Sequence, residues 1–225
     1  LPDKSPDPIA RAVAFSWGFD LTLNLGGETI TAQLHALGRH QLNNLRTALM
    51  AVETFAELEG KRIVPGKIAK AIENLRFPGR CEVWSRNPAI VLDSAHCALS
   101  ARAAASACRE HFDERPIALV LGMLGDKNHA AILRELARAG RIAHVRTYTP
   151  PTPRACPAEE VAHRAARVLP DVRACASVSD AIGETLALAA RDPNLVILVA
   201  GTFYGLAPAR HALEFALGAR QEGKA

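Results

Sequence analysis

Residues 117–139 read IALVLGMLGDKNHAAILRELARA, and the fold class follows from this stretch. Five consecutive apolar residues, Ile117–Leu121, predict a buried β-strand. A glycine-containing loop follows, and the apolar spacing after it predicts an amphipathic helix near 129–139. A buried strand followed by a helix is the repeating unit of a parallel α/β sheet, and the same unit recurs on both sides of this stretch.

Six short apolar runs alternate with helical patterns in the second two thirds of the chain. The runs are Cys81–Trp84, Ala89–Leu92, Ile117–Leu121, His144–Tyr148, Val172–Cys175 and Leu195–Ala200. The helices are expected near 98–112, 129–139, 158–168, 180–191 and 205–217. Only four residues, 85–88, separate the first two runs, so these pair antiparallel, whereas helical crossovers make the later strands parallel. The sequence therefore predicts a doubly wound, mostly parallel six-stranded sheet with one antiparallel edge strand.

The first 77 residues follow a different pattern. Residues 20–25 and 29–34 alternate apolar and polar side chains around Gly26-Gly27-Glu28, which predicts a hairpin. Helices are expected from about Asn43 to Leu58 and from Gly66 to Leu75. One hairpin and two helices are too little for a self-sufficient core, so residues 1–77 are interpreted as the tail of a preceding domain and residues 78–225 as a second domain.

Composition excludes several classes of protein. The 225 residues are 49% hydrophobic and 22% charged, a balance typical of globular chains and not of disordered ones. The longest apolar run, 117–124, is far shorter than the roughly 20 residues that span a bilayer, so no membrane role is expected. The net charge is +4, but the basic residues are scattered, so no nucleic-acid partner is expected. Five cysteines without a C-x-x-C pair suggest a reducing, cytoplasmic location.

One candidate site follows the second apolar run, in Val91-Leu92-Asp93-Ser94-Ala95-His96. Ligands of open α/β sheets bind where the strands end at their carboxyl edge. A carboxylate there can accept from hydroxyl groups or position a basic partner, and a histidine at a helix start can donate to an anion. The alternative is that Asp93 or Ser94 caps the following helix.

Other candidates lie at the junction and at two more strand ends. Arg80, in Pro78-Gly79-Arg80, has the planar fork that suits phosphate, against the alternative of a surface arginine in a hinge. Lys127 lies in the loop 122–128, which is equally interpretable as a turn that caps a helix. Thr202 and Tyr204 follow the last strand and can hydrogen-bond a substrate, or simply form a strand-to-helix turn.

Two nucleotide-binding patterns and metal spacing are missing from the sequence. Residues 60–68 resemble a phosphate loop but hold five residues between the glycines and carry Ile68 where a hydroxyl is needed. No G-x-G-x-x-G is present, and no histidines stand at metal-ligand spacing. No metal ligand and no confident catalytic residue is therefore assigned in this chain.

The order and spacing of the motifs are more specific than any one of them. They run GRHQLNN (38–44), FPGRCEV (77–83), LDSAH (92–96), GMLGDKN (122–128), TP…PRA (149–155) and GTFY (201–204). This series resembles the second half of the folylpolyglutamate synthase and dihydrofolate synthase family, the folate branch of the Mur ligases, from about Asp20 onward. The resemblance implies that residues 1–77 are the end of an ATP-binding domain and residues 78–225 the C-terminal Rossmann-like domain.

The resemblance also implies an activity. The family uses ATP and Mg²⁺ to join L-glutamate to a dihydropteroate or folate carboxylate through an acyl phosphate, mostly as cytoplasmic monomers. By position, Asn44, Arg80 and Asp93 match nucleotide-binding residues. His96, Lys127, Thr202 and Tyr204 are candidates for the glutamate site or the closed state. Addition of the first glutamate, extension of the tail, or both remain open.

The chain departs from the family pattern in several ways, among them Ser94 where Gly is common and Thr202 where Ser is common. Cys97-Ala98 stands where the family usually has Asn-Pro, which replaces an amide with a weaker thiol partner. The phosphate loop and the Mg²⁺ ligands are expected upstream of Leu1, so the chain is interpreted as a piece of a longer protein that is inactive alone. The alternatives are a non-catalytic stand-alone α/β binding module and a peptidoglycan-type Mur ligase.

Overall fold

The computed structural model describes residues 7–222, and it divides into two compact units. Unit 1 comprises Leu1–Phe77 and unit 2 comprises Pro78–Ala225. Among the described residues, no helix combines the length and the apolarity that crossing a bilayer requires. Each unit has its own hydrophobic core.

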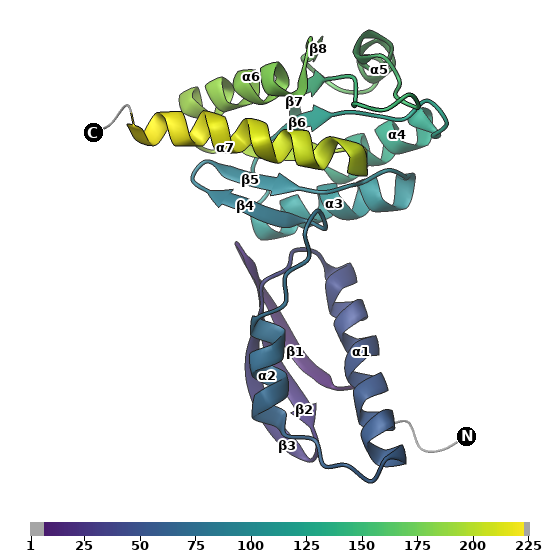
Figure 1. Ribbon diagram of the computed structural model, residues 1–225, viewed down its shortest axis with the longest axis vertical. Helices are drawn as coiled ribbons and strands as arrows, with labels where there is room; N and C mark the ends of the chain where they lie inside the picture. Colours follow the sequence, from purple (N-terminus) through teal and green to yellow (C-terminus); the bar gives the residue numbers. More distant parts are fainter. Residues whose placement is uncertain (1–6, 223–225) are drawn as a thin grey trace. The chain divides into compact units, whose positions relative to one another are not determined.

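Unit 1 contains a three-stranded antiparallel sheet in the order β1-β2-β3 (Figure 1). The strands are β1 (Ile9–Phe15), β2 (Gly18–Leu25) and β3 (Glu28–Leu34). The predicted hairpin is confirmed: Gly26 and Gly27 join β2 to β3 with φ of 57° and 82°, the positive values that a two-residue hairpin turn requires. The expectation of a single hairpin was incomplete, because β1 adds a third strand beside β2.

Two helices cover one face of this sheet. They are α1 (Arg39–Leu58) and α2 (Pro65–Glu73), and α1 begins four residues before the predicted start. Alternate residues of β2, from Phe19 to Leu25, pack with Leu45 and Ile72 in one core. Both helices begin and end within a few residues of the bounds predicted from the apolar periodicity, because that periodicity determines which helix face is buried.

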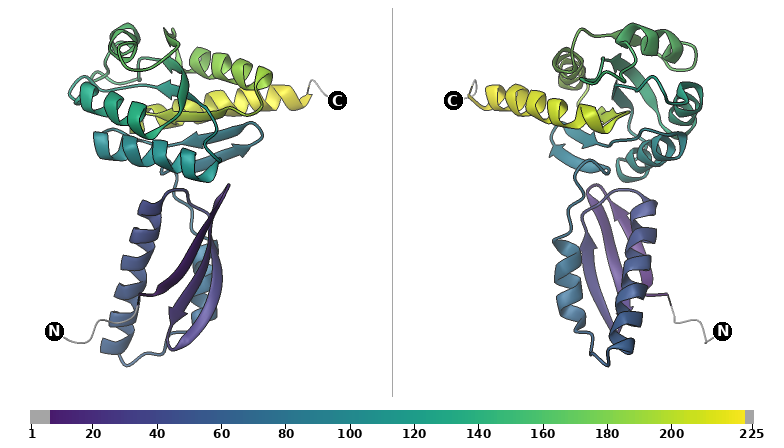
Figure 2. Two further views of the ribbon diagram at one scale, coloured as in Figure 1. Left: turned by 180° about the vertical axis from the view of Figure 1, so that it is seen from behind. Right: turned by 45° about the vertical axis from the view of Figure 1, so that its right-hand side comes forward.

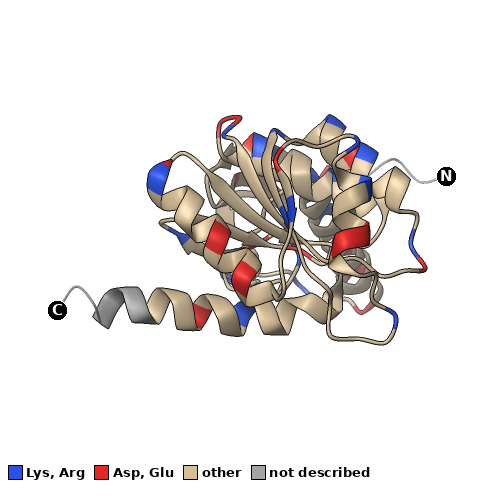
Figure 3. Ribbon diagram, turned by 90° about the horizontal axis from the view of Figure 1, so that it is seen from above, with Lys and Arg blue, Asp and Glu red and all other residues tan. Residues whose placement is uncertain are grey.

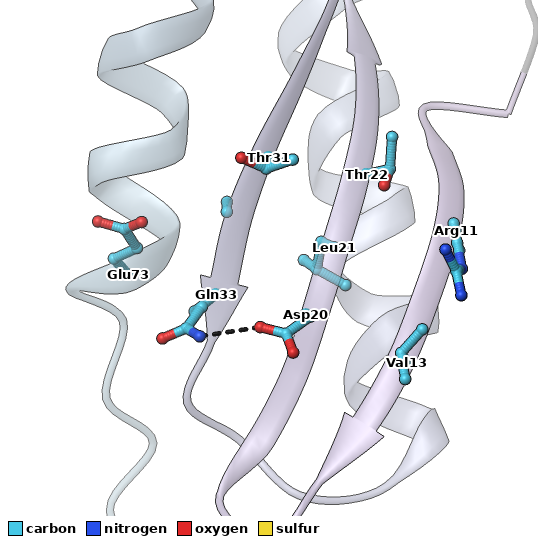
Figure 4. Close-up of a pocket in the computed structure, with 9 residues that line it drawn as sticks. Arg11, Val13, Asp20, Leu21, Thr22, Thr31, Gln33 and Glu73 are labelled. Atoms are coloured by element: carbon cyan, nitrogen blue, oxygen red, sulfur yellow. Dashed lines mark hydrogen bonds between the residues drawn. The ribbon is translucent and has the colours of Figure 1, made fainter.

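The opposite face of the same sheet is polar. Asp20 and Thr22 of β2 lie beside Thr31 and Gln33 of β3, and Gln33 donates to Asp20 at 2.8 Å. These side chains and Arg11 line a pocket of about 480 Å³ (Figure 4). None of the predicted site residues, all of which lie within the described part of the chain, lines this pocket.

Unit 2 is built on a six-stranded sheet in the order β4-β5-β9-β6-β7-β8. The strands are β4 (Glu82–Arg86), β5 (Ala89–Leu92), β6 (Ile117–Leu121), β7 (Ile142–Thr147), β8 (Val172–Ala174) and β9 (Val196–Ala200). Only the edge pair β4–β5 is antiparallel. The predicted fold class is confirmed, including its antiparallel edge strand.

Helices cover both faces of this sheet (Figures 1 and 2). They are α3 (Ala98–His111), α4 (His129–Ala139), α5 (Ala158–Ala165), α6 (Val178–Arg191) and α7 (Leu206–Glu222), with a short 3₁₀ helix at Phe203–Gly205. The helices α6 and α7 pack on one face, and α3 and α4 lie on the other. Charged residues of both signs are interspersed along them (Figure 3), in keeping with the scattered charge of the sequence.

The strand order indicates which edge of the sheet is suited to bind a ligand. The last strand, β9, lies between β5 and β6, so the chain reverses direction across the sheet at this point. Ligands of doubly wound folds bind at such reversal points, outside the carboxyl ends of the strands. The loops that leave β5, β9 and β6 there are residues 93–97, 201–205 and 122–128.

Candidate functional site

Backbone hydrogen bonds hold the three loops against one another. The N–H of Asp93 donates to the carbonyl of Val199 at 2.9 Å, and the N–H of Gly122 donates to that of Ala200 at 3.2 Å. A methyl group on Gly201 would lie 2.1 Å from the Gly122 carbonyl oxygen, so only glycine permits this close approach. The predicted candidates after these three strands therefore share one edge of unit 2.

Two carboxylates hold the junction turn that carries Arg80. The N–H of Gly79 donates to Oε2 of Glu82 at 2.7 Å, and the N–H of Cys81 donates to Oδ2 of Asp93 at 2.7 Å. The carbonyl of Gly79 in turn accepts from the N–H of Ser94 at 3.0 Å. The turn is thereby fixed to the carboxyl end of β5.

The backbone angles and the close packing of this turn restrict which residue types can occupy it. Gly79 has φ of 69°, and a Cβ there would lie 2.4 Å from Cδ1 of Leu206. Cys81 also has a positive φ, 47°, which is uncommon for a residue with a side chain and is sustained here by its bonds to Asp93. Between them, the Arg80 side chain is exposed, and it has no ion pair among the described residues. A clamped turn thus presents an uncompensated guanidinium to solvent.

Both carboxylate oxygens of Asp93 accept hydrogen bonds from backbone N–H groups. The residue is only 6% exposed, and its Oδ1 accepts from the N–H of Ala95 at 2.7 Å while Oδ2 holds Cys81. The alternative that Asp93 or Ser94 caps the next helix is wrong, because the N-cap of α3 is Cys97, which forms a capping box with Ser100. The reason is spacing: Asp93 uses both oxygens one turn before the helix begins.

His96 and Cys97 are exposed beside this turn. A hydrogen bond from the Ser100 hydroxyl, a further bond to its backbone and the nearby charge of Lys127 hold the pKa of the Cys97 thiol below its ordinary value. The other four cysteines are buried, and burial raises the pKa of Cys81 and Cys108. Cys97 is therefore the reactive thiol of the site edge.

The loop after β6 carries Lys127 next to an ion pair that sequence reasoning missed. Oδ2 of Asp126 lies 2.5 Å from a guanidinium nitrogen of Arg154 and 3.4 Å from Nζ of Lys127. The Arg154 hydrogen bond holds the pKa of Asp126 below its usual range. The hydrogen bond to Asp126 is the main cause of the raised pKa of Arg154, and Tyr204, which faces the same guanidinium, adds to it. Arg154 thus brings the loops after β6, β7 and β9 together.

The loop after β9 contains one buried and one half-exposed polar side chain. Thr202 is 2% exposed, and its hydroxyl oxygen accepts from the N–H of Tyr204 at 3.3 Å. Tyr204 itself is half exposed. Beneath the loops, the buried ring of Tyr148 fills the space that side chains at Gly122 and Gly205 would need. Thr202 is thus part of the loop's packing, and Tyr204 carries its accessible hydroxyl.

The remaining candidate, Asn44, lies on α1 of unit 1. Its side chain is exposed and its Nδ2 donates to Oε1 of the buried Gln41 at 3.1 Å. Within residues 7–222, no three or more His, Cys, Asp or Glu side chains are grouped so that they could hold a metal ion.

Comparison with known proteins gives the same assignment as the motif series. Residues 79–203 match the family model described as Mur ligase, glutamate ligase domain. A folylpolyglutamate synthase of Lacticaseibacillus casei is 27% identical over 207 residues, which are 91% of this chain and 46% of that relative. A dihydrofolate synthase/folylpolyglutamate synthase of Mycobacterium tuberculosis is 34% identical over 177 residues, or 76% of this chain and 36% of that protein.

Solved structures give the same relationship. The Mycobacterium tuberculosis folylpolyglutamate synthase complexed with ADP matches with a TM-score of 0.76 and 26% identity, over 90% of this chain and 46% of that one. The chain thus spans at most about half the length of these relatives. Because the family model covers more than half of its residues, the chain belongs to the Mur ligase family, and residues 79–203 are its glutamate ligase domain.

Proposed function

We propose that this chain is the C-terminal part of an ATP-dependent ligase that adds L-glutamate to dihydropteroate, to a folate, or to both. The family match and the folylpolyglutamate synthase relatives support the ligase class. The observation that carries the proposal is the junction turn, which presents the unpaired Arg80 at the edge where three strand ends converge. Unit 1 is then the end of the central ATP-binding domain and unit 2 the C-terminal domain.

The proposed chemistry needs an activated carboxylate. Transfer of the γ-phosphoryl group of ATP to a carboxylate oxygen of the acceptor gives an acyl phosphate and ADP. The amine of glutamate then attacks the carbonyl carbon, the carbon–oxygen bond to phosphate breaks, inorganic phosphate leaves, and the amine loses a proton. Most of the catalysis is positioning and stabilisation of negative charge.

This chain would supply cations and fixed loops to that reaction. Arg80 would stabilise phosphate charge, because its planar fork suits phosphate oxygens and no carboxylate within residues 7–222 forms an ion pair with it. Asn44 is the proposed nucleotide contact of unit 1. Asp93, with both oxygens bound to N–H groups, acts by fixing the Arg80 turn.

Glutamate would bind to the other side of the same edge. Lys127 and the exposed His96 are the groups available to its carboxylates, and Tyr204 is the accessible hydroxyl. Thr202 would act through the shape of the loop after β9. The phosphate loop and the Mg²⁺ ligands are proposed to lie in the half of the relatives that this chain does not match.

The test is a ligation assay with the complete polypeptide that contains this chain. Incorporation of labelled glutamate is measured with dihydropteroate, tetrahydrofolate and a nucleotide-linked muramyl peptide as acceptors, each with and without ATP. We expect ATP-dependent incorporation into one or both pterin acceptors and none into the muramyl acceptor. Arg80→Ala is expected to lower kcat at least about 100-fold, as loss of a charge-stabilising group typically does, whereas Arg191→Ala on α6 is the matched control and keeps full activity.

Three outcomes would contradict the proposal. Incorporation into the muramyl acceptor alone would indicate a peptidoglycan-type ligase. No incorporation into any acceptor by the complete, folded protein would favour a non-catalytic binding module. Near-normal rates with Arg80→Ala would remove the assigned role of the junction turn.

The chain of 225 residues assayed alone is expected to be inactive, and ATP-dependent ligation by it would contradict the division of the site between two halves.

A further inference from the structure

A pocket of unit 2 lies between α4 and the end of α5. It has a volume of about 470 Å³, and its polar lining comprises four cations, Lys127, Arg134, Arg164 and Arg167, together with Asn128 and His129. The proposed ligase function uses only Lys127 of this set. We call this cavity the α4–α5 basic pocket.

The charges of this pocket are only half compensated. Lys127 faces Asp126 at 3.4 Å, and Arg164 forms an ion pair with Glu160. The side chains of Arg134 and Arg167 have no carboxylate partner among the described residues. The guanidinium of Arg167 instead contacts Nε2 of the His163 ring at 3.2 Å. Like charges gathered around one cavity repel, and an anion that bridges them removes this cost.

A buried histidine fixes the cationic wall in place. His129 is 3% exposed; its Nε2 lies 2.8 Å from the carbonyl oxygen of Leu124, and its Nδ1 lies 2.7 Å from Nη1 of Arg164. A carbonyl only accepts and a guanidinium only donates, so Nε2 carries the proton and Nδ1 accepts. Arg164 is therefore held by a fixed imidazole as well as by its ion pair with Glu160.

Part of the wall is apolar, which restricts the class of ligand that fits the pocket. Ala130, Leu133 and Val168 lie among the cations. A bare inorganic anion would leave this surface in water, whereas an anionic group on a carbon skeleton would cover it. Two uncompensated arginines match a ligand with at least two negative charges.

We propose that the α4–α5 basic pocket binds a small organic anion of charge −2 or more, a phosphate ester or a polycarboxylate. Arg134 and Arg167 contact its charged group, and Arg164 is presented to it by His129. The bond from His129 to Leu124 connects the pocket to the loop that carries Lys127, so an occupant lies next to the proposed glutamate site without replacing it. The pocket is a feature of unit 2 alone, so binding does not depend on the ligation reaction.

The test is isothermal titration calorimetry of the 225-residue chain at low ionic strength. The probes are phenyl phosphate and citrate, with benzoate as a monovalent control. We expect at least one of the two multivalent anions to bind, and benzoate to bind at least about tenfold more weakly, because it offers one charge to two arginines. Binding of phenyl phosphate alone assigns a phosphate ester, and binding of citrate alone assigns a polycarboxylate.

Variants locate the bound anion. The double variant Arg134→Gln/Arg167→Gln is expected to weaken binding at least about tenfold, while Arg191→Gln, which removes one charge from α6, leaves it unchanged. Both arginines of the double variant are exposed, so the fold is kept, and circular dichroism checks this. The proposal is overturned if neither multivalent anion binds, if Arg191→Gln weakens binding equally, or if Arg80→Gln abolishes binding that the double variant keeps. The ligation assay above can fail independently of this result.

Discussion

Oδ2 of Asp93 accepts a hydrogen bond from the backbone N–H of Cys81 at 2.7 Å. This bond joins the end of β5 to a turn twelve residues earlier in the chain, and it holds Cys81 at a positive φ of 47°. The carboxylate for which the sequence predicts a nucleotide contact thus binds, in this structure, the residue next to Arg80. Its contribution can be measured as stability and as activity.

Replacing Asp93 with asparagine tests this relationship. Asp93→Asn keeps the size of the side chain but puts one amide NH₂ against a backbone N–H. We expect the free energy of unfolding of the chain to fall by about 1–3 kcal/mol, the usual effect of disrupting a buried hydrogen bond to a charged group. Urea unfolding measures it, with the exposed Asp113→Asn as control. An unchanged midpoint would show that Asp93 does not hold the turn.

Two glycine substitutions should change stability in opposite directions. Gly79→Ala meets Leu206 at 2.4 Å and must keep φ at 69°, so we expect a loss of about 1–3 kcal/mol. Gly183→Ala lies in the middle of α6 with nothing within 4 Å of the added methyl group, so we expect a gain of about 0.5–1 kcal/mol. Thermal unfolding compares the two, and a Gly79→Ala protein as stable as the parent would contradict the packing described here.

Alkylation should modify one cysteine faster than the others. Of the five cysteines, all within the described residues, only Cys97 is exposed, and its pKa is lowered first of all by the hydrogen bond with Ser100. A lower pKa gives more thiolate at neutral pH, so iodoacetamide should label Cys97 first, as peptide mapping by mass spectrometry would show. Ser100→Ala should slow this labelling. Equal labelling of Cys97 and a buried cysteine would show that the thiol is not activated.

Stability should depend on acid through Asp171. Burial alone would raise the pKa of this carboxyl, but hydrogen bonds from His144 and the buried Arg146 lower it below its ordinary value. A lowered pKa in the folded state means that the stabilisation is present above the unfolded pKa of about 3.9 and is lost as pH falls through the folded value. We expect Asp171→Asn to destabilise the chain more at pH 7 than at pH 3 in urea unfolding. A difference that does not shrink in acid would contradict this role.

Much of the fold was predictable because buried strands of a parallel sheet are nearly continuous apolar runs. The run Ile117–Leu121 coincides with β6, and Ala89–Leu92 coincides with β5. The strand β1 was missed because its sequence, IARAVAF, shows no regular alternation and is paired on one side only, with a shift in register near Ile9. Backbone pairing, which leaves no mark on the side-chain pattern, decides such edge strands.

The candidate site was predictable only as a set of strand ends. The sequence places Asp93, Lys127 and Tyr204 after three strands, and the strand order then brings those ends to one edge. It does not show that Asp93 turns inward to Cys81, because that depends on a turn with unusual backbone angles. It also does not show Arg154 beside Asp126, since 28 residues separate them and no periodicity connects them.

The position of β9 has a consequence for biosynthesis. The strands β5 and β6 each bond to β9 and not to one another, so the first half of the sheet cannot close until residues 196–200 have been made. Because the chain is synthesised from its N-terminus onward, the apolar edges of β5 and β6 that later pair with β9 stay exposed while about a hundred residues are translated. Nascent chains that stall before β9 would be ready substrates for chaperones and proteases, and the edge that carries Arg80, Lys127 and Tyr204 would be the last part of this domain to assemble.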